Sequence, residues 1–401
     1  MQFSSRSIGH TPPTLATLVL LSGLSALSMN LYLPSLPFMA VYFDTDYKVM
    51  QLSIALYLLV NALMQILIGP IADKAGRRPV LLWGLGLFLL ATLGCIYAPN
   101  VELFLFFRMS QAVIVVGLVL SRAAVRDMFE QDQAASMIGY VTMGMAVVPM
   151  IGPAIGGVLE ESFGWKANFW LPFGLAVLAL ALTYMDFGET SAKSGKTLMQ
   201  QFREYPELLT SPRFWGYSLS SALSSGAFFA YLGGAPFIGT EVFGLTAAEV
   251  GIYFGAPAVG YFFGNFISGR YSVRFGVNRM VLWGCWLNAI GVALSAALFL
   301  LGMGTAFSFF GFMTFVGLGN GMSIPNATAG SLSVRPHLAA TASGLSGAIM
   351  LGGGAALSAL AGALLTRETG AMPLLWLMLA TSILAIIAIS SVIWRERQLG
   401  L

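Results

Sequence analysis

The chain has 401 residues, of which 57% are hydrophobic and only 9% are charged, and its formal net charge is +3. Soluble domains carry roughly 25% charged residues. A chain with so few charges cannot cover the surface of a water-soluble globule, so the composition excludes an ordinary soluble protein and predicts a surface that faces lipid.

The N-terminal apolar run and the cysteines argue against a secreted protein. The run begins near Leu15 and continues into Asn30 and Pro34 without a small-residue cleavage pattern, so we expect a retained membrane helix rather than a signal peptide. Cys95 and Cys285 both lie inside apolar runs, which is typical of small buried side chains and not of a disulfide framework.

Twelve apolar runs approach the roughly 20 helical residues that are needed to cross a hydrocarbon core. They lie near 15–37, 50–70, 79–98, 102–123, 134–158 and 167–187, and near 213–237, 247–269, 279–301, 304–328, 340–364 and 371–394. We therefore predict an all-α membrane protein with 12 transmembrane helices, built from an N-terminal six-helix bundle (1–187), a linker (188–212) and a C-terminal six-helix bundle (213–401).

The basic residues predict the orientation of these helices. Lysines and arginines gather in the loops on the side of the two termini and the linker, whereas the opposite loops hold only Lys48, Lys166 and Arg367. Because cytoplasmic loops carry the excess of basic residues, we expect both termini and the linker in the cytoplasm and the chain in the inner membrane.

The two halves also repeat one another in sequence. The segments around 69–84 and 269–284 align without a gap at an offset of 200 residues, through the pairs Gly69/Gly269, Gly76/Gly276, Leu82/Leu282, Trp83/Trp283 and Gly84/Gly284. Internal repeats of this size are typical of transporters whose two halves rock about a central substrate site.

The loop between the second and third spans resembles the signature loop of the major facilitator superfamily. It reads Gly69-Pro-Ile-Ala-Asp73-Lys-Ala-Gly76-Arg77-Arg78. The resemblance implies a twelve-helix fold in two pseudo-symmetric bundles and a gating role for this loop, with Asp73 pairing across the cytoplasmic face.

An arginine motif in the fourth span extends the resemblance. Arg108 and Gln111 lie several residues inside the span, where a charge is costly and should face a cavity and find a partner. The alternative is that Arg108 reaches back to the outer interface. Nearer the inner end, Arg126 and Asp127 are interpreted as an anchoring pair that contributes to gating.

The fifth span carries a glycine–proline run that resembles the motif of drug-exporting members. Its residues Gly152, Pro153, Gly156 and Gly157 suit a hinge or a seal, or close packing alone. Together with Asn30-Leu-Tyr32-Leu-Pro in the first span, this run narrows the resemblance to the Bcr/CflA branch.

The chain departs from that branch at one informative position. Many members carry aspartate where this chain has Asn30, and no Asp or Glu lies in the middle of any predicted span. Because a proton-coupled exporter of cations needs a buried carboxylate, this absence argues against cationic substrates and leaves the export of neutral compounds open.

Polar and aromatic side chains at helical spacing predict a neutral cavity between the halves. Such a cavity suits a planar heteroaromatic solute, although single members of the set could serve only as packing or as interhelical hydrogen bonds. The predicted substrate-binding residues are Asn30, Tyr32, Tyr57, Asn61, Gln65, Arg108, Gln111, Ser224, Phe228, Tyr231, Tyr253, Tyr261, Asn265 and Asn320.

Segments of the first, fourth and fifth spans resemble the alphaproteobacterial CcoA-like subgroup, which includes importers of copper and of riboflavin. This resemblance implies uptake of riboflavin or a similar solute. The alternative is efflux of chloramphenicol- or florfenicol-type drugs by proton antiport, and a third hypothesis is copper import. Copper fits less well, because His10 and His337 lie outside the spans and the 20 methionines are read as packing.

No pattern in the sequence predicts an enzyme. We find no nucleophile–base pair, metal-ligand cluster or phosphate-binding loop, and we therefore expect no cofactor and no metal site. The expected partners are a small-molecule substrate and membrane lipid, without nucleic acid, and we expect the chain to act as a monomer.

Overall fold

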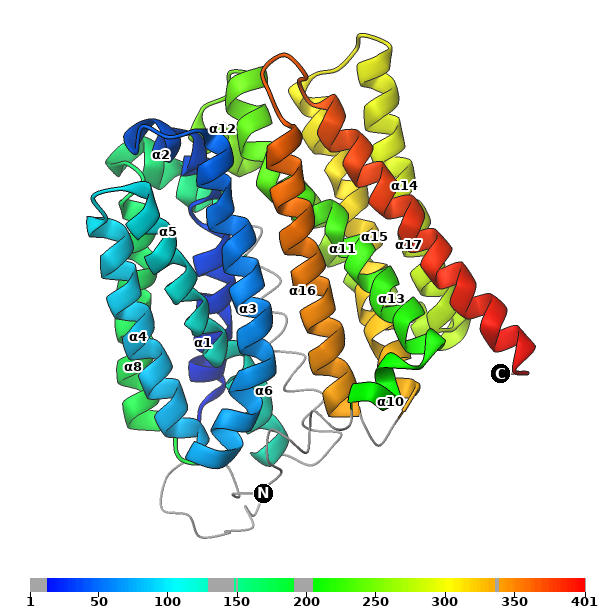
Figure 1. Cartoon of the computed structure of the whole chain (residues 1–401), viewed down its shortest axis with the longest axis horizontal. Coiled ribbons are helices and arrows are strands. Elements are labelled where there is room, and N and C mark those ends of the chain that lie inside the picture. The colour runs from blue at the N-terminus through cyan, green and yellow to red at the C-terminus, as the bar shows by residue number, and fades with distance from the viewer. Residues whose placement is uncertain (1–12, 129–147, 149–150, 191–204, 336–338, 401) are drawn as a thin grey trace.

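The computed structural model describes residues 13–128, 148, 151–190, 205–335 and 339–400, and within them it contains helices and no strand. Eleven of these helices are long and apolar enough to cross a membrane. Figure 1 shows them side by side in two bundles, with the earlier part of the chain in one and the later part in the other. The predicted all-α membrane fold is confirmed.

The first bundle, here called the N-half, contains α1 to α8. Most of the predicted fifth span lies outside the described residues, but its last part is helical over residues 151–163. The other elements are α1 Leu15–Asn30, the 3₁₀ helix η1 Leu33–Ser35, α2 Leu36–Tyr42, α3 Tyr47–Ala75, α4 Arg77–Tyr97, α5 Val101–Ser110, the 3₁₀ helix η2 Gln111–Ile114, α6 Val115–Met128 and α8 Ala167–Asp186.

The second bundle, the C-half, contains α10 to α17. Its elements are α10 Tyr205–Leu209, α11 Pro212–Phe237, the π-helical turn η3 Ile238–Val242, α12 Ala247–Tyr253, α13 Gly255–Phe275, α14 Val277–Leu300, α15 Ala306–Ser333, α16 Ala339–Leu364 and α17 Met372–Gln398.

Two predicted spans are divided in the structure, and proline explains both divisions. A proline lacks the N–H that would bond to the carbonyl four residues earlier. In the first span α1 ends at Asn30, four residues before Pro34, and in the eighth span α12 ends at Tyr253, four residues before Pro257. The α-helix is therefore interrupted at these two points, although each pair of segments still forms one span.

Two repeat-matched glycines mark equivalent turns in the two halves. Gly76 lies between α3 and α4 with φ +96°, and Gly276 lies between α13 and α14 with φ +83°. Side chains other than glycine rarely adopt this left-handed region. The matched positions therefore share a backbone requirement, which agrees with the predicted internal repeat.

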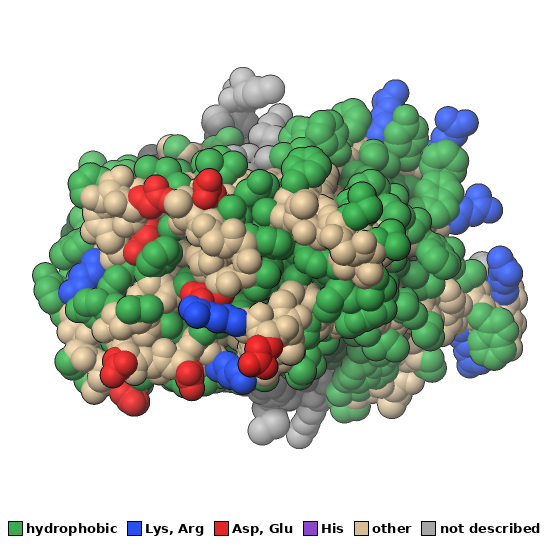
Figure 2. All heavy atoms as spheres, turned by 90° about the horizontal axis from the view of Figure 1, so that it is seen from above, with side chains coloured by type: hydrophobic (Ala, Val, Ile, Leu, Met, Phe, Trp, Pro, Cys, Tyr) green, Lys and Arg blue, Asp and Glu red, His purple; other side chains and the backbone are tan. Residues whose placement is uncertain are grey.

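The two halves are joined at one end of the molecule. We call it the outer end, following the orientation predicted from the basic residues; it carries the loops that precede α3 and α12 and the loop that follows α16. A shared hydrophobic cluster combines N-half residues such as Leu36 and Ile54 with C-half residues such as Ala230 and Ala361. Figure 2 looks onto this end and shows acidic and a few basic side chains over its left and central part, among apolar side chains.

At the opposite, inner end the described residues form separate clusters. Leu18 and Leu81 belong to a cluster within the N-half, and Phe214 and Ile389 belong to a cluster within the C-half. The described structure therefore has its outer end closed and no hydrophobic cluster that joins the halves at the inner end.

Candidate functional site

A buried arginine forms the centre of the N-half. Arg108, on α5, is only 1% exposed, so it does not reach back to the outer interface. Its guanidinium lies between two aromatic rings, 4.3 Å from the ring centre of Tyr32 and 4.1 Å from that of Tyr57. A cation above a ring face is attracted by the ring's negative face. The two tyrosines therefore hold the charge from both sides.

Neutral groups complete the surroundings of this arginine. Arg108 Nη2 donates to the backbone oxygen of Ser28 (3.0 Å), and Nη1 donates to Gln111 Oε1 (2.7 Å). Gln111 in turn donates to Thr92 Oγ1 (2.8 Å). Among the described residues no carboxylate pairs with Arg108, and its Nε has no hydrogen-bond partner. The N-half centre is thus a fixed positive charge held by uncharged partners.

The other predicted residues of the N-half make hydrogen bonds that do not involve Arg108. Asn30 is buried and donates to the backbone oxygen of Ala26 (2.7 Å). Asn61 accepts a hydrogen bond from Gln65 Nε2 (3.0 Å), one turn further along α3. The residues of the predicted polar face of α3 therefore have different partners. The ring of Tyr57 contacts Arg108, whereas Asn61 and Gln65 bond to each other.

The C-half has a neutral polar network at the corresponding place, between its first, third and fourth spans. Ser224 on α11 donates to Asn320 Oδ1 on α15 (2.8 Å). Asn288 on α14 donates to the oxygens of both residues, at 3.1 and 3.2 Å. All three are buried. The sequence prediction named Ser224 and Asn320 but missed Asn288.

The predicted aromatic residues of the C-half pack into one cluster. Tyr231 is fully buried, with its ring centre 5.0 Å from that of Phe254 and 6.3 Å from that of Phe228. Tyr253 stacks on Phe310 at 4.9 Å with an interplanar angle of 19°. These rings contact one another, so in the conformation described they act as packing.

Two further predicted residues lie on α13. Asn265 donates to the backbone oxygen of Tyr261 (2.8 Å) within the same helix. Both side chains are half-buried. Asn265 therefore bonds within α13, and its side chain is not among those that form the Ser224–Asn288–Asn320 hydrogen bonds.

The glycine–proline run contacts the C-half at the outer end. A side chain at Gly157 would overlap the backbone oxygen of Ala247 on α12, and one at Gly251 would overlap that of Pro153. The backbone of residues 151–163 therefore crosses that of α12 at contact distance. Such close crossings require small residues.

The neighbouring glycines of the run have other contacts. Gly156 packs on the backbone oxygen of Leu31 within the N-half, and its own oxygen accepts from Asn168 (3.0 Å). Gly152 faces Leu27 and Asn30. Only part of the predicted motif therefore lies between the halves.

A carboxylate adds to the outer seal. Glu161 Oε1 accepts from the backbone N–H of Ala248 (3.0 Å), in the first turn of α12. This bond, with a further one from the side chain of Thr246, holds the pKa of Glu161 below its ordinary value. The ionised form of Glu161 therefore favours the closed outer end.

At the inner end, the turn before α4 is held by an acid that the prediction did not name. Glu189 accepts from the backbone N–H groups of Arg77 (2.9 Å) and Arg78 (3.2 Å), and Arg78 donates to the backbone oxygen of Tyr184 (2.8 Å). A side chain at Gly76 would approach Glu189 to 2.6 Å. The contacts of the predicted gating residues Gly69, Asp73, Arg126 and Asp127 lie outside the described part of the structure.

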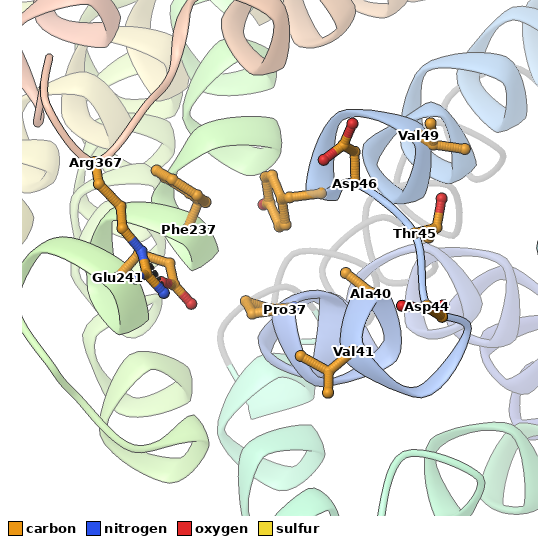
Figure 3. Close-up of a pocket in the computed structure, with 11 residues that line it drawn as sticks. Pro37, Ala40, Val41, Asp44, Thr45, Asp46, Val49, Phe237, Glu241 and Arg367 are labelled. Atoms are coloured by element: carbon orange, nitrogen blue, oxygen red, sulfur yellow. Dashed lines mark hydrogen bonds and ion pairs between the residues drawn. The ribbon is translucent and has the colours of Figure 1, made fainter.

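A cavity of about 760 Å³ opens at the outer end, and none of the predicted substrate-binding residues lines it. Figure 3 shows Asp44 and Asp46 on its N-half side, and Phe237 on its C-half side with Glu241 and Arg367. Arg367 Nε donates to Glu241 Oε2 (2.7 Å). We call this cavity the external vestibule, following the predicted orientation; it lies at the closed outer end and is not the predicted central site.

Comparisons with known proteins agree with this architecture. The family model described as Major Facilitator Superfamily matches residues 18–358. A chloramphenicol resistance protein of Pseudomonas aeruginosa is 29% identical over 97% of this chain and 94% of its own length. A bicyclomycin resistance protein homolog of Haemophilus influenzae is 27% identical over 93% of this chain and 94% of its own length. Multidrug resistance protein D of Escherichia coli is 28% identical over 92% of this chain and 95% of its own length.

Solved structures show the same fold at low sequence identity. A bacterial homolog of the human lysosomal transporter Spinster, in an inward-facing and occupied conformation, matches with a TM-score of 0.73 and 18% identity over 96% of both chains. A peptide transporter in complex with sulfate matches with a TM-score of 0.77 and 12% identity over 96% of this chain and 94% of its own.

Proposed function

Because the chain belongs to the Major Facilitator Superfamily and is a multi-pass membrane transporter, we propose that it exports uncharged aromatic compounds of the chloramphenicol kind. The observation that carries the proposal is the N-half centre, in which Arg108 lies between two tyrosines and has only neutral hydrogen-bond partners. The names of the relatives favour efflux over the uptake of riboflavin that the sequence resemblance suggested.

The charge distribution supports an uncharged substrate. Within the described residues, every Asp and Glu lies in a loop or in the terminal turn of a helix. A cationic drug that entered between the halves would therefore meet the field of Arg108, with which no described carboxylate pairs. The repulsion is strong in a medium of low dielectric constant, whereas a neutral ring with electronegative substituents avoids it.

The outer seal fits the first step of export. The halves are joined at the outer end by the crossing of α12 with residues 151–163. A transporter closed on this side receives its substrate from the inner side, and rocking of the halves then releases it outside. Alternating access between such states is the mechanism that we propose.

The test is drug tolerance in a bacterium that lacks its own efflux pumps and carries this gene. We expect greater tolerance of chloramphenicol and florfenicol and unchanged tolerance of the cation ethidium. Arg108→Gln provides the matched variant, because it removes the charge and keeps a hydrogen-bonding side chain; it should lower the preference for neutral drugs.

A second arm separates efflux from uptake. A riboflavin auxotroph without its own transporter is grown on low riboflavin with the same gene. Growth rescue without any gain in drug tolerance would overturn the export proposal in favour of uptake. No effect in either arm would refute both substrate hypotheses while leaving the family assignment intact.

A further inference from the structure

Two polar side chains on the outer part of α3 cross from the N-half into the C-half. Tyr47 and Gln51 are four residues apart, so they lie on one face of the helix. Tyr47 Oη donates to the backbone oxygen of Gly233 on α11 (3.0 Å), and its ring lies 5.0 Å from that of Phe237. Gln51 Nε2 donates to the backbone oxygen of Ser358 on α16.

Gln51 occupies a recess that only small residues can form. The side chain is 1% exposed, although it belongs to one half and is enclosed by the other. A methyl group at Gly362 would overlap its amide oxygen, and one at Gly233 would overlap its amide nitrogen. The two glycines and Ser358 thus form a socket on the C-half for a single N-half side chain.

The socket lies at the contact that must open when the outer end opens. α3 and α16 pack against each other along the junction of the halves, as Figure 1 shows at the centre of the molecule. Rocking of the halves separates these helices at their outer ends. Gln51 must then leave the socket and lose its buried hydrogen bond to Ser358.

We propose that Gln51 is the latch of the outer gate: seated between Gly233, Ser358 and Gly362, it holds the outer end closed, and its withdrawal accompanies outward opening. Tyr47 covers the socket on its outer side, at the floor of the external vestibule, which it lines together with Phe237. The latch depends on the shape of the socket and on one hydrogen bond, so it acts whatever the substrate is.

The test measures how often the outer end opens, without transport. Ala55 is buried one helical turn further from the outer end than Gln51, on the same face of α3. The Ala55→Cys protein is treated in whole cells with a membrane-impermeant maleimide, and the rate of labelling reports opening. The protein without this change gives the background, since Cys95 and Cys285 are both buried.

Filling the socket should hold the gate open. We expect Gly362→Ala to raise the labelling rate several-fold, because the new methyl group excludes Gln51. Gln51→Ala should raise the rate as well, because it removes the latch, and the double change Gln51→Ala with Gly362→Ala should raise it no further, because both changes abolish the same contact. Gly352→Ala is the matched control: it lies on the same helix, and a side chain there meets nothing.

An unchanged rate in Gly362→Ala or in Gln51→Ala, or a double variant that is labelled faster than both single variants, would overturn the latch. If Gly362→Ala fails to reach the membrane, Gln51→Glu makes the same test without an overlap. It replaces the donor with an oxygen opposite the Ser358 carbonyl and should also raise the rate; labelling no faster than in the parent refutes the proposal. Labelling needs no drug, so this outcome is independent of the proposed export.

Discussion

Replacing Arg108 by lysine should destabilise the protein more than replacing it by glutamine, although lysine keeps the charge. The guanidinium is flat, lies between two rings and makes two strong hydrogen bonds, at 3.0 Å and 2.7 Å. An ammonium group is compact and more strongly hydrated, and it cannot fill this slot in the same way. Losing one charge-assisted bond, worth about 1.5–3 kcal/mol, and about 1 kcal/mol of ring contact lowers the unfolding free energy by about 3 kcal/mol.

Glutamine in place of Arg108 removes the buried charge together with its contacts. The desolvation cost of the charge is of the same order as the contacts that compensate it, so we expect a change of no more than about 1 kcal/mol. The measurement is unfolding of the purified protein in mild detergent with increasing denaturant, followed by tryptophan fluorescence. Tyr57→Phe is the control, because it keeps the ring beside the guanidinium and removes only the hydroxyl. A lysine variant as stable as the parent would refute the reasoning.

Three further predictions concern the C-half network, the outer seal and the substrate. Asn288→Ala removes the two N–H donors that its amide shares among three acceptor oxygens and should lower the unfolding free energy by about 1 kcal/mol, at about 0.6 kcal/mol for each donor; an unchanged denaturant midpoint would contradict this. Glu161 has a pKa below its ordinary value of 4.5 while it accepts from Ala248, so the closed state loses stability as the external pH falls below 4.5. Labelling at Ala55→Cys should rise in that window relative to labelling of the same site in the Glu161→Gln protein at the same pH, a ratio that cancels the loss of reactive thiolate in acid. Asn30→Asp should extend drug tolerance to ethidium, because the added carboxylate offsets the positive field; a substrate range like that of the parent would count against the role of that field.

The sequence predicts the helices well because their causes are local. A span needs only a sufficient number of consecutive apolar residues, and the turns at Gly76 and Gly276 need only a residue that tolerates positive φ. The interruptions of the first and eighth spans after Asn30 and Tyr253 are also predictable from the sequence, since each of these residues precedes a proline by four positions. Treating those runs as unbroken spans overlooked that signal.

The site was only partly predictable, because its contacts depend on how distant helices are rotated against one another. Spacing correctly placed Tyr57, Asn61 and Gln65 on one face of α3, but it could not show that Tyr57 alone would meet Arg108. Glu189 was missed for the same reason, since it contacts backbone groups more than 100 residues away. Gln51 was missed because a polar residue near the end of a span is ordinarily taken as an interface anchor.

The polar centres of the two halves lie at equivalent positions but differ in their chemical groups. The polar centres lie at the junction of the same three spans, with Ser28 and Arg108 in one half and Ser224, Asn288 and Asn320 in the other. The sequence repeat does not reveal this, because Ser28 and Ser224 are 196 residues apart whereas the matched glycines are 200 apart. The N-half centre carries the positive charge of Arg108, whereas the C-half centre is neutral, so the electrostatic field between the halves is asymmetric. A neutral molecule with an electronegative edge can orient in such a field, whereas a cation is repelled from one wall without being bound by the other, and this asymmetry is the physical basis for expecting uncharged substrates.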